Sequence, residues 1–122
     1  MSKEKLYIFD TTLRDGAQTQ GVDFSIDDKE KISNSLDNLG VDYIEGGWPG
    51  ANPTDTEFFN KDHGFKNAKL TAFGMTKKSE HSAENDPMLA SLINSKSSSV
   101  CLFGKSWDFQ VDVALGITNE EN

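Results

Sequence analysis

The sequence predicts an α/β fold in which parallel strands alternate with helices. Short apolar runs rich in β-forming residues recur along the chain, and a helix N-cap signal follows each of the first three runs. Polar residues stand where the first, second and fourth runs end. This βαβαβαβ order implies parallel strands that are joined by right-handed crossovers.

The first strand and the first helix are predicted from the N-terminal forty residues. Residues 5–9 form an apolar run. Apolar side chains occupy both odd and even positions, as expected for a strand that is buried on both faces of a sheet. Ser25 is the expected N-cap of a helix, and Ile32 and Leu36 follow at helical spacing. Gly40 stands where a glycine in the left-handed conformation ends a helix.

The middle of the chain predicts a second strand and a short helix. Residues 41–45 form the strand, and Asn52 followed by a proline is a helix N-cap signal. We therefore expect a helix over residues 54–60, with Phe58 and Phe59 as its contacts with the core.

Two further strands and one helix are expected in the second half. Residues 69–73 and 98–103 form the strands, and Asp86, followed by a proline, opens the helix between them. Cys101 lies inside the last strand and is expected to be a small core residue. A long loop is expected after it. Near the end, Thr118 with a glutamate three residues later has the form of a capping box, which either starts a fourth helix or belongs to a frayed acidic tail.

Composition excludes several classes of protein. With twelve basic residues against twenty acidic ones, the net charge is −8, whereas a nucleic-acid binder needs a basic surface. No apolar run approaches the roughly 20 residues that cross a bilayer, and the start of the chain lacks the apolar core of a signal peptide. One cysteine cannot form an internal disulfide. We expect a cytoplasmic protein with no nucleic-acid or membrane partner.

Candidate functional residues follow the strands, where parallel α/β folds bind ligands. Asp10, Arg14 and Asp15 follow the first strand, and Glu45 ends the second. Carboxylates such as Asp15 and Glu45 suit Mg²⁺ or Mn²⁺, and the permanently charged Arg14 could hold a carboxylate or an oxyanion. On these residues alone, a plain Asp-Gly turn with a structural ion pair is the favoured alternative.

Three motifs resemble one family and reverse that preference. Residues 9–18, FDTTLRDGAQ, resemble the first-strand signature of the isopropylmalate, homocitrate and citramalate synthases and their lyase relatives. Residues 43–49, YIEGGWP, resemble the second-strand motif, and residues 103–108, FGKSWD, resemble the fourth-strand segment of the citramalate-synthase branch. The resemblance covers nearly the whole chain in the right order.

The resemblance implies a TIM barrel that condenses acetyl-CoA with an α-keto acid, pyruvate being favoured. A divalent metal, Mg, Mn or Zn, would polarise the keto carbonyl, the enolate of the thioester would attack it, and hydrolysis of the CoA ester would follow. Isopropylmalate or homocitrate synthesis, or lyase cleavage in reverse, are the alternatives within the class. Family members of this kind are expected to be homo-oligomers.

Site residues are implied motif by motif. Asp15 would be a metal ligand, and Arg14 would bind substrate and stabilise developing negative charge. Gln18 would lie against the metal and the keto acid. Glu45 would be an active-site carboxylate, either as a base or in support of other residues, and Asp10 would support the loop after the first strand.

Two departures limit what the resemblance implies for residues 1–122. Gln110 stands where the branch usually has a histidine, and the His-x-His metal pair of the family lies on strands that this sequence does not contain. A complete barrel needs about 250 residues. We therefore expect residues 1–122 to be the N-terminal part of the barrel domain, about four βα units truncated before the later strands, and to be inactive alone.

The alternative from another class of function is a non-catalytic half-barrel that self-associates through its open strand edges.

Overall fold

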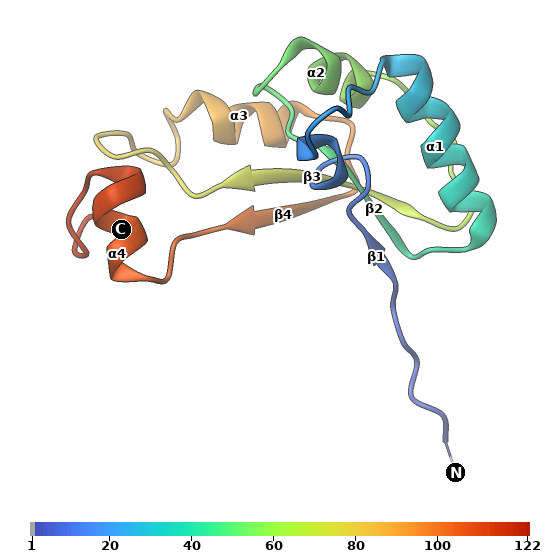
Figure 1. Ribbon diagram of the computed structural model, residues 1–122, viewed down its shortest axis with the longest axis horizontal. Coiled ribbons are helices and arrows are strands. Elements are labelled where there is room, and N and C mark those ends of the chain that lie inside the picture. The colour runs from blue at the N-terminus through green and yellow to red at the C-terminus, as the bar shows by residue number, and fades with distance from the viewer. Residues whose placement is uncertain (1) are drawn as a thin grey trace.

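The computed structural model describes residues 2–122, which form one parallel sheet of four strands with helices between them (Figure 1). In chain order the elements are β1 (Phe9–Asp10), the 3₁₀ turn η1 (Gly16–Gln18), α1 (Ile26–Leu39), β2 (Tyr43–Gly47), α2 (Pro53–Asn60), β3 (Lys69–Met75), α3 (Pro87–Asn94), β4 (Ser99–Phe103), α4 (Asp108–Gln110) and the π-helical turn η2 (Val111–Leu115). Each strand pairs in parallel with the next one in the sequence.

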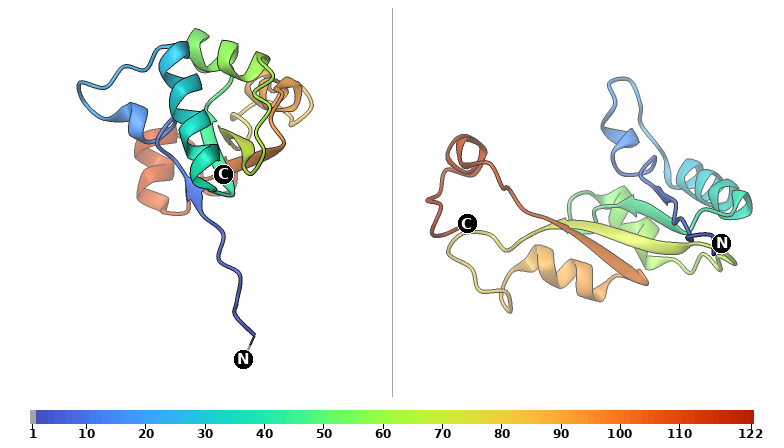
Figure 2. Two further views of the ribbon diagram at one scale, coloured as in Figure 1. Left: turned by 90° about the vertical axis from the view of Figure 1, so that its right-hand side faces the viewer. Right: turned by 90° about the horizontal axis from the view of Figure 1, so that it is seen from below.

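The strand order identifies the architecture. The order is β1-β2-β3-β4, and α1, α2 and α3 lie on the same side of the sheet (Figures 1 and 2). A doubly wound fold would reverse its strand order and carry helices on both faces, whereas a TIM barrel winds its strands in sequence with every helix outside. The four βα units therefore form the N-terminal half of a TIM barrel, as expected from the sequence.

Helix α1 has the ends that its sequence predicts. The Ser25 hydroxyl accepts the N–H of Asp28, and the Asp28 carboxylate accepts the N–H of Ser25, which completes a capping box. At the other end Gly40 has a φ of 93°, a left-handed conformation in which a side chain would be strained. These local contacts fix both ends of the helix.

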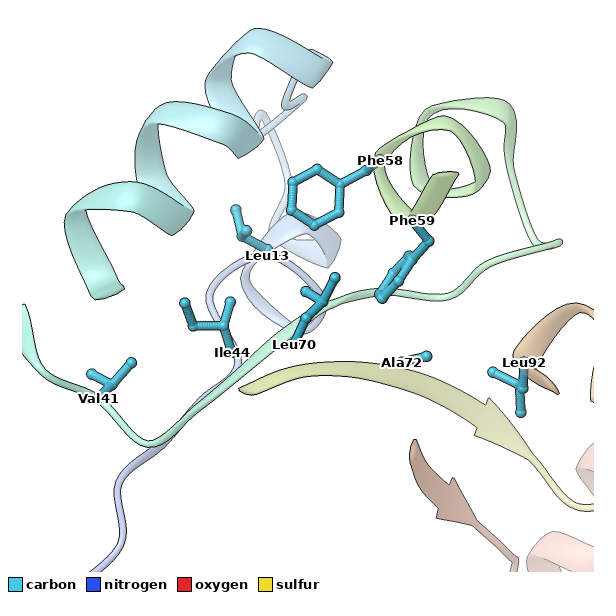
Figure 3. Packing of buried hydrophobic residues seen from close by; sticks show 8 residues of the cluster. All are labelled: Leu13, Val41, Ile44, Phe58, Phe59, Leu70, Ala72 and Leu92. Atoms are coloured by element: carbon cyan, nitrogen blue, oxygen red, sulfur yellow. The ribbon is translucent and has the colours of Figure 1, made fainter. Parts of the chain in front are cut away.

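The hydrophobic core lies between the sheet and the helices (Figure 3). Ile44 and Leu70 from the strands meet Phe58 and Phe59 from α2, as predicted, and all four are buried. Gly46 makes this packing possible, because a Cβ atom there would lie 2.7 Å from the Phe58 ring and 2.9 Å from Leu70. Aromatic side chains of α2 therefore pack directly on the backbone of β2.

Asp86 begins α3 and is a buried carboxylate. Its two oxygens accept the N–H groups of Lys78, Met88 and Leu89. The N–H groups of Lys78 and Leu89 lower the pKa of Asp86 to about 2, against an opposing effect of burial. The predicted N-cap is thus confirmed, and it also fixes the loop that precedes the helix.

The first strand is shorter than predicted, and the prediction that residues 5–9 are buried on two faces is wrong. Only Phe9 and Asp10 are in strand conformation, and Leu6, Tyr7 and Ile8 are exposed. The Ile8 carbonyl accepts the N–H groups of Asp42 and Tyr43, so pairing starts there. Among residues 2–122, β2 is the one strand that pairs with β1, which leaves its far edge uncovered.

The last predicted elements also differ in part. Strand β4 forms as expected, but Val100, Leu102 and Phe103 are exposed, because β4 is the other edge of the sheet. The predicted loop beyond it contains α4 and η2. At the start of α4 the rings of Trp107 and Phe109 pack in a tilted arrangement, with their centroids 5.0 Å apart.

The capping contact expected at the C-terminal end is present. The Thr118 hydroxyl accepts the N–H of Glu121, in a turn.

No helix within residues 2–122 is long and apolar enough to cross a membrane.

Two neighbouring residues on α3 test how the core is built. Leu92 is 4% exposed against β3, whereas Ile93 is 82% exposed. Leu92→Ala should lower the free energy of unfolding by about 2–5 kcal/mol through the cavity it leaves, and Ile93→Ala should change it by less than about 0.5 kcal/mol. Urea unfolding followed by circular dichroism measures both, and equal losses would contradict the packing.

Candidate active site

The candidate site lies on the face of the sheet that turns away from the helices. Side chains alternate along a strand, so that Ile44 and Leu70 face the core while Glu45 and Thr71 face the opposite side. Glu45, Thr71 and Ser99 are aligned across β2, β3 and β4, and the hydroxyls of Thr71 and Ser99 are 2.6 Å apart. This face is the interior of a barrel, where residues near the carboxyl ends of strands bind ligands.

An ion pair between Arg14 and Glu45 forms the centre of the site. Arg14 Nε donates to Glu45 Oε1 at 2.5 Å, and the Glu45 side chain is 1% exposed. The Arg14 guanidinium also lies over the Phe73 ring, with Cζ 4.2 Å from the centroid. Glu45 and Phe73 together fix the orientation of the guanidinium. Nη1 also lies 3.5 Å from the Asp15 carboxylate, and the other Nη hydrogens remain available as donors.

A tight turn after β1 presents Arg14 and Asp15. The Thr11 carbonyl accepts the N–H groups of residues 14, 15 and 16, which closes the turn. Asp10 stabilises its start, because its carboxylate accepts both the N–H and the hydroxyl of Thr12. The expected support of this loop by Asp10 agrees with these contacts.

The structure places the other two predicted residues in more open positions. The Asp15 side chain is 65% exposed, and its carboxylate is 3.5 Å from Arg14 Nη1. Gln18 ends η1 and is exposed. Arg14, Asp15 and Glu45 are therefore brought together, whereas Gln18 is exposed on the 3₁₀ turn that follows Asp15.

A second ion pair lies buried on the core side of β2. Lys29 of α1 is 2% exposed, and its ammonium is 2.6 Å from Asp55 Oδ1. The same ammonium donates to the Leu13 carbonyl at 2.9 Å and to the Gly46 carbonyl at 2.7 Å. Asp55 in turn accepts the N–H of Trp48. This pair connects α1, α2, β2 and the loop that carries Arg14.

Cys101 lies beside the Arg14–Glu45 pair, although we expected it in the core. It is opposite Phe73 in the register of β3 and β4, and it is half-buried. Burial and the neighbouring negative charge of Glu45 raise the pKa of the Cys101 thiol, although Arg14 counteracts this effect. The protonated thiol is a poor nucleophile, so Cys101 forms part of the wall of the site.

The described residues do not form a metal centre by themselves. Among residues 2–122 no three His, Cys, Asp or Glu side chains converge on one point. Asp15 offers an accessible carboxylate, but the nearby Glu45 carboxylate is engaged by Arg14. Asp15 therefore supplies one ligand of the kind that Mg²⁺ and Mn²⁺ prefer, and a complete site would need further donors.

Sequence reasoning missed Lys29, Asp55 and Thr71. A signal for Lys29 was present, since it lies three and seven residues before Ile32 and Leu36 and so shares their helical face. A lysine on such a face needs a buried acceptor. No comparable signal marked Thr71, because its partner on β4 is distant in the sequence.

The fold and the site define the first half of an α/β barrel with an arginine–carboxylate pair at the carboxyl ends of its first strands. A family model described as HMGL-like matches residues 5–121. The chain belongs to the HMGL-like family.

Several curated proteins are similar to this chain. An (R)-citramalate synthase of Aquifex aeolicus is 54% identical over 98% of the chain, and one of Sulfolobus acidocaldarius is 48% identical over 100% of the chain. A 2-isopropylmalate synthase of Caldanaerobacter subterraneus is 34% identical over 99% of the chain. The chain spans 23%, 24% and 30% of the length of these three relatives.

The buried Arg14–Glu45 pair predicts a difference between two adjacent residues. Arg14→Met leaves the Glu45 carboxylate buried without its partner and should lower the free energy of unfolding by about 3–5 kcal/mol. Asp15→Asn changes an exposed side chain and should cost less than about 0.5 kcal/mol. Urea unfolding at neutral pH measures both.

A double variant provides the control. Arg14→Met combined with Glu45→Leu removes both charges, and it should recover most of the loss because a buried ion pair can be replaced by apolar side chains of similar size. If Arg14→Met cost no more than Asp15→Asn, the ion pair would not be the buried contact described above.

Proposed function

We propose that residues 1–122 form the N-terminal part of the catalytic barrel of an acyltransferase that joins acetyl-CoA to an α-keto acid. The oriented Arg14 guanidinium at the carboxyl end of the barrel strands is the observation that carries the proposal. The identity of the chain to proteins named (R)-citramalate synthase supports pyruvate as the keto acid. The weaker identity to a 2-isopropylmalate synthase makes 2-ketoisovalerate the alternative.

Arg14 is proposed to hold the substrate and the charge that develops on it. Its Nε is engaged by Glu45, so the Nη groups can donate to a carboxylate or to the oxygen of the attacked ketone. Phe73 beneath the guanidinium keeps water away from one face. An arginine held in this way loses little freedom when an anion binds.

Glu45 is proposed to orient Arg14, which favours one of the two tasks left open by the sequence. A general base must reach the proton that it removes, whereas the Glu45 carboxylate is buried and accepts from Arg14. Asp15 and Gln18 remain proposed as a ligand of a divalent metal and as a substrate contact. The described residues supply only part of such a metal site.

A chimera tests the proposed reaction. Residues 1–122 would replace the aligned segment of the Aquifex aeolicus relative, to which they are 54% identical. The chimera should release CoA from acetyl-CoA in the presence of pyruvate, as measured with a thiol reagent. Arg14→Ala should reduce kcat by about 10²–10³-fold, the usual loss when one donor to a developing oxyanion is removed. Residues 1–122 alone should release no CoA.

Controls separate the site from the stability of the protein. Lys31→Ala removes an exposed α1 lysine and should leave the rate within about twofold of the parent. A panel of pyruvate, 2-ketoisovalerate and 2-ketoglutarate compares the keto acids. Faster release with 2-ketoisovalerate would contradict the choice of pyruvate, and an unchanged rate in Arg14→Ala would contradict the role of Arg14.

Self-association of a half-barrel is a second candidate function, and the exposed edges of the sheet favour it. Leu6, Tyr7 and Ile8 are exposed beside β1, and Val100 and Leu102 are exposed on β4. Unpaired strand edges with apolar side chains are templates for pairing with another strand. Two copies could close their sheets by pairing β1 of one with β4 of the other.

Light scattering tests this second candidate. At about 100 µM, a concentration at which an interface worth about 8 kcal/mol is saturated, the chain should have at least twice its own mass of 13.5 kDa. Val100→Lys should shift it toward the mass of one chain, because a lysine on an edge strand opposes pairing. A parent chain that stays at 13.5 kDa excludes self-association.

A further inference from the structure

We propose that Lys29 is a positioning residue that sets the geometry of the Arg14–Glu45 ion pair from the opposite side of β2. Its ammonium binds the carbonyl of the residue before Arg14 and the carbonyl of the residue after Glu45. The inference rests on the proposed function for its meaning in catalysis. Its test measures the ion pair itself, so the outcome does not depend on turnover.

The donors of Lys29 are all used within the protein. An ammonium has three hydrogens, and its three partners are the carbonyls of Leu13 and Gly46 and the carboxylate of Asp55, at 2.9, 2.7 and 2.6 Å. With 2% of the residue exposed, no donor is left for a substrate. Lys29 therefore acts on the site through the backbone and does not touch the reacting groups.

The contact with Leu13 fixes the peptide plane that carries Arg14. The Leu13 carbonyl and the Arg14 nitrogen belong to one planar peptide unit, so holding the carbonyl limits the rotation of that unit. Leu13 is itself fully buried in the core. The Arg14 side chain thus leaves a backbone that is anchored on the core side.

The contact with Gly46 restrains β2 at a point where its pairing with β3 is irregular. The register between β2 and β3 is interrupted between Glu45 and Gly47, and Gly47 has a φ of 146°. Two consecutive glycines have more conformational freedom than any other pair. Lys29 on the Gly46 carbonyl restrains the strand directly beside Glu45.

Asp55 completes the arrangement by balancing the buried charge. Its carboxylate accepts from Lys29 and from the N–H of Trp48, and a Cβ on Gly47 would lie only 2.5 Å from Asp55 Cγ. A buried lysine without this partner would be costly. With it, α2 holds the ammonium in place while the ammonium holds the two carbonyls.

The experiment uses Arg14 as its own probe, because Arg14 is the only arginine in the sequence. Its Nε–H signal in a ¹⁵N–¹H spectrum of residues 1–122 needs no assignment. In the parent chain this hydrogen should exchange with water slowly, since it is bonded to a buried carboxylate. Lys29→Met should speed the exchange by about tenfold or more and move the signal toward that of free arginine.

A matched control and a second variant complete the test. Asp37 of α1 is another buried charged residue, and its carboxylate accepts the backbone N–H groups of residues 66–68. Asp37→Asn removes this charge and should leave the Arg14 signal unchanged. Lys29→Met with Asp55→Asn removes both charges and keeps an acceptor for Trp48. It should fold if Lys29→Met does not, and should show the same fast exchange.

Each outcome of the exchange experiment either supports or contradicts the role of Lys29. Fast exchange in a folded Lys29 variant together with slow exchange in Asp37→Asn supports the proposal. Slow exchange in the folded Lys29 variants, equal changes in Asp37→Asn, or the failure of both Lys29 variants to fold would overturn it and leave Lys29 as a residue of stability alone. An inactive chimera with the expected Arg14 signals would instead contradict the proposed function and leave this inference intact.

Discussion

The buried ammonium of Lys29 is the contact that holds together the segments around the candidate site. It joins a helix, a strand end and a loop that are far apart in the sequence, and Asp55 adds a second helix to the same point. A buried charge is stable only when its partners are all in place. The contacts of Lys29 therefore hold the four segments together at the end of the sheet where the candidate site lies.

Strand β2 places two ion pairs back to back. Because side chains alternate along a strand, Glu45 points into the barrel face and meets Arg14, while Gly46 faces the helices. Because Gly46 has no side chain, Phe58 can approach the strand, and the Gly46 carbonyl accepts a hydrogen bond from Lys29. One strand thus connects the packing of the core to the orientation of Arg14.

The open edges of the sheet explain where apolar side chains are exposed. Strands β2 and β3 have neighbours on both sides and are mostly buried, whereas β1 and β4 each pair on one side. The two (R)-citramalate synthases similar to this chain are about four times as long. The uncovered faces are those at which a TIM barrel continues with further strands and helices.

Local sequence determined the elements of this protein, and tertiary contacts determined their roles. The ends of α1 and the start of α3 could be predicted from Ser25, Gly40 and Asp86, because capping depends on residues within a few positions. The motifs around Arg14 and Glu45 likewise indicated the family, and the structure brings these two residues together. The caps and the motifs need no knowledge of distant neighbours.

The burial of Lys29, the place of Cys101 in the wall of the site and the exposure of residues 6–8 were decided by the fold alone. Each depends on which segments lie on either side of a strand or helix, and those segments are separated by many residues. A lysine on an apolar helix face is buried only if carbonyls and a carboxylate from elsewhere meet it there. An apolar run next to a strand is likewise covered only where another element packs against it, and sequence periodicity does not contain that information.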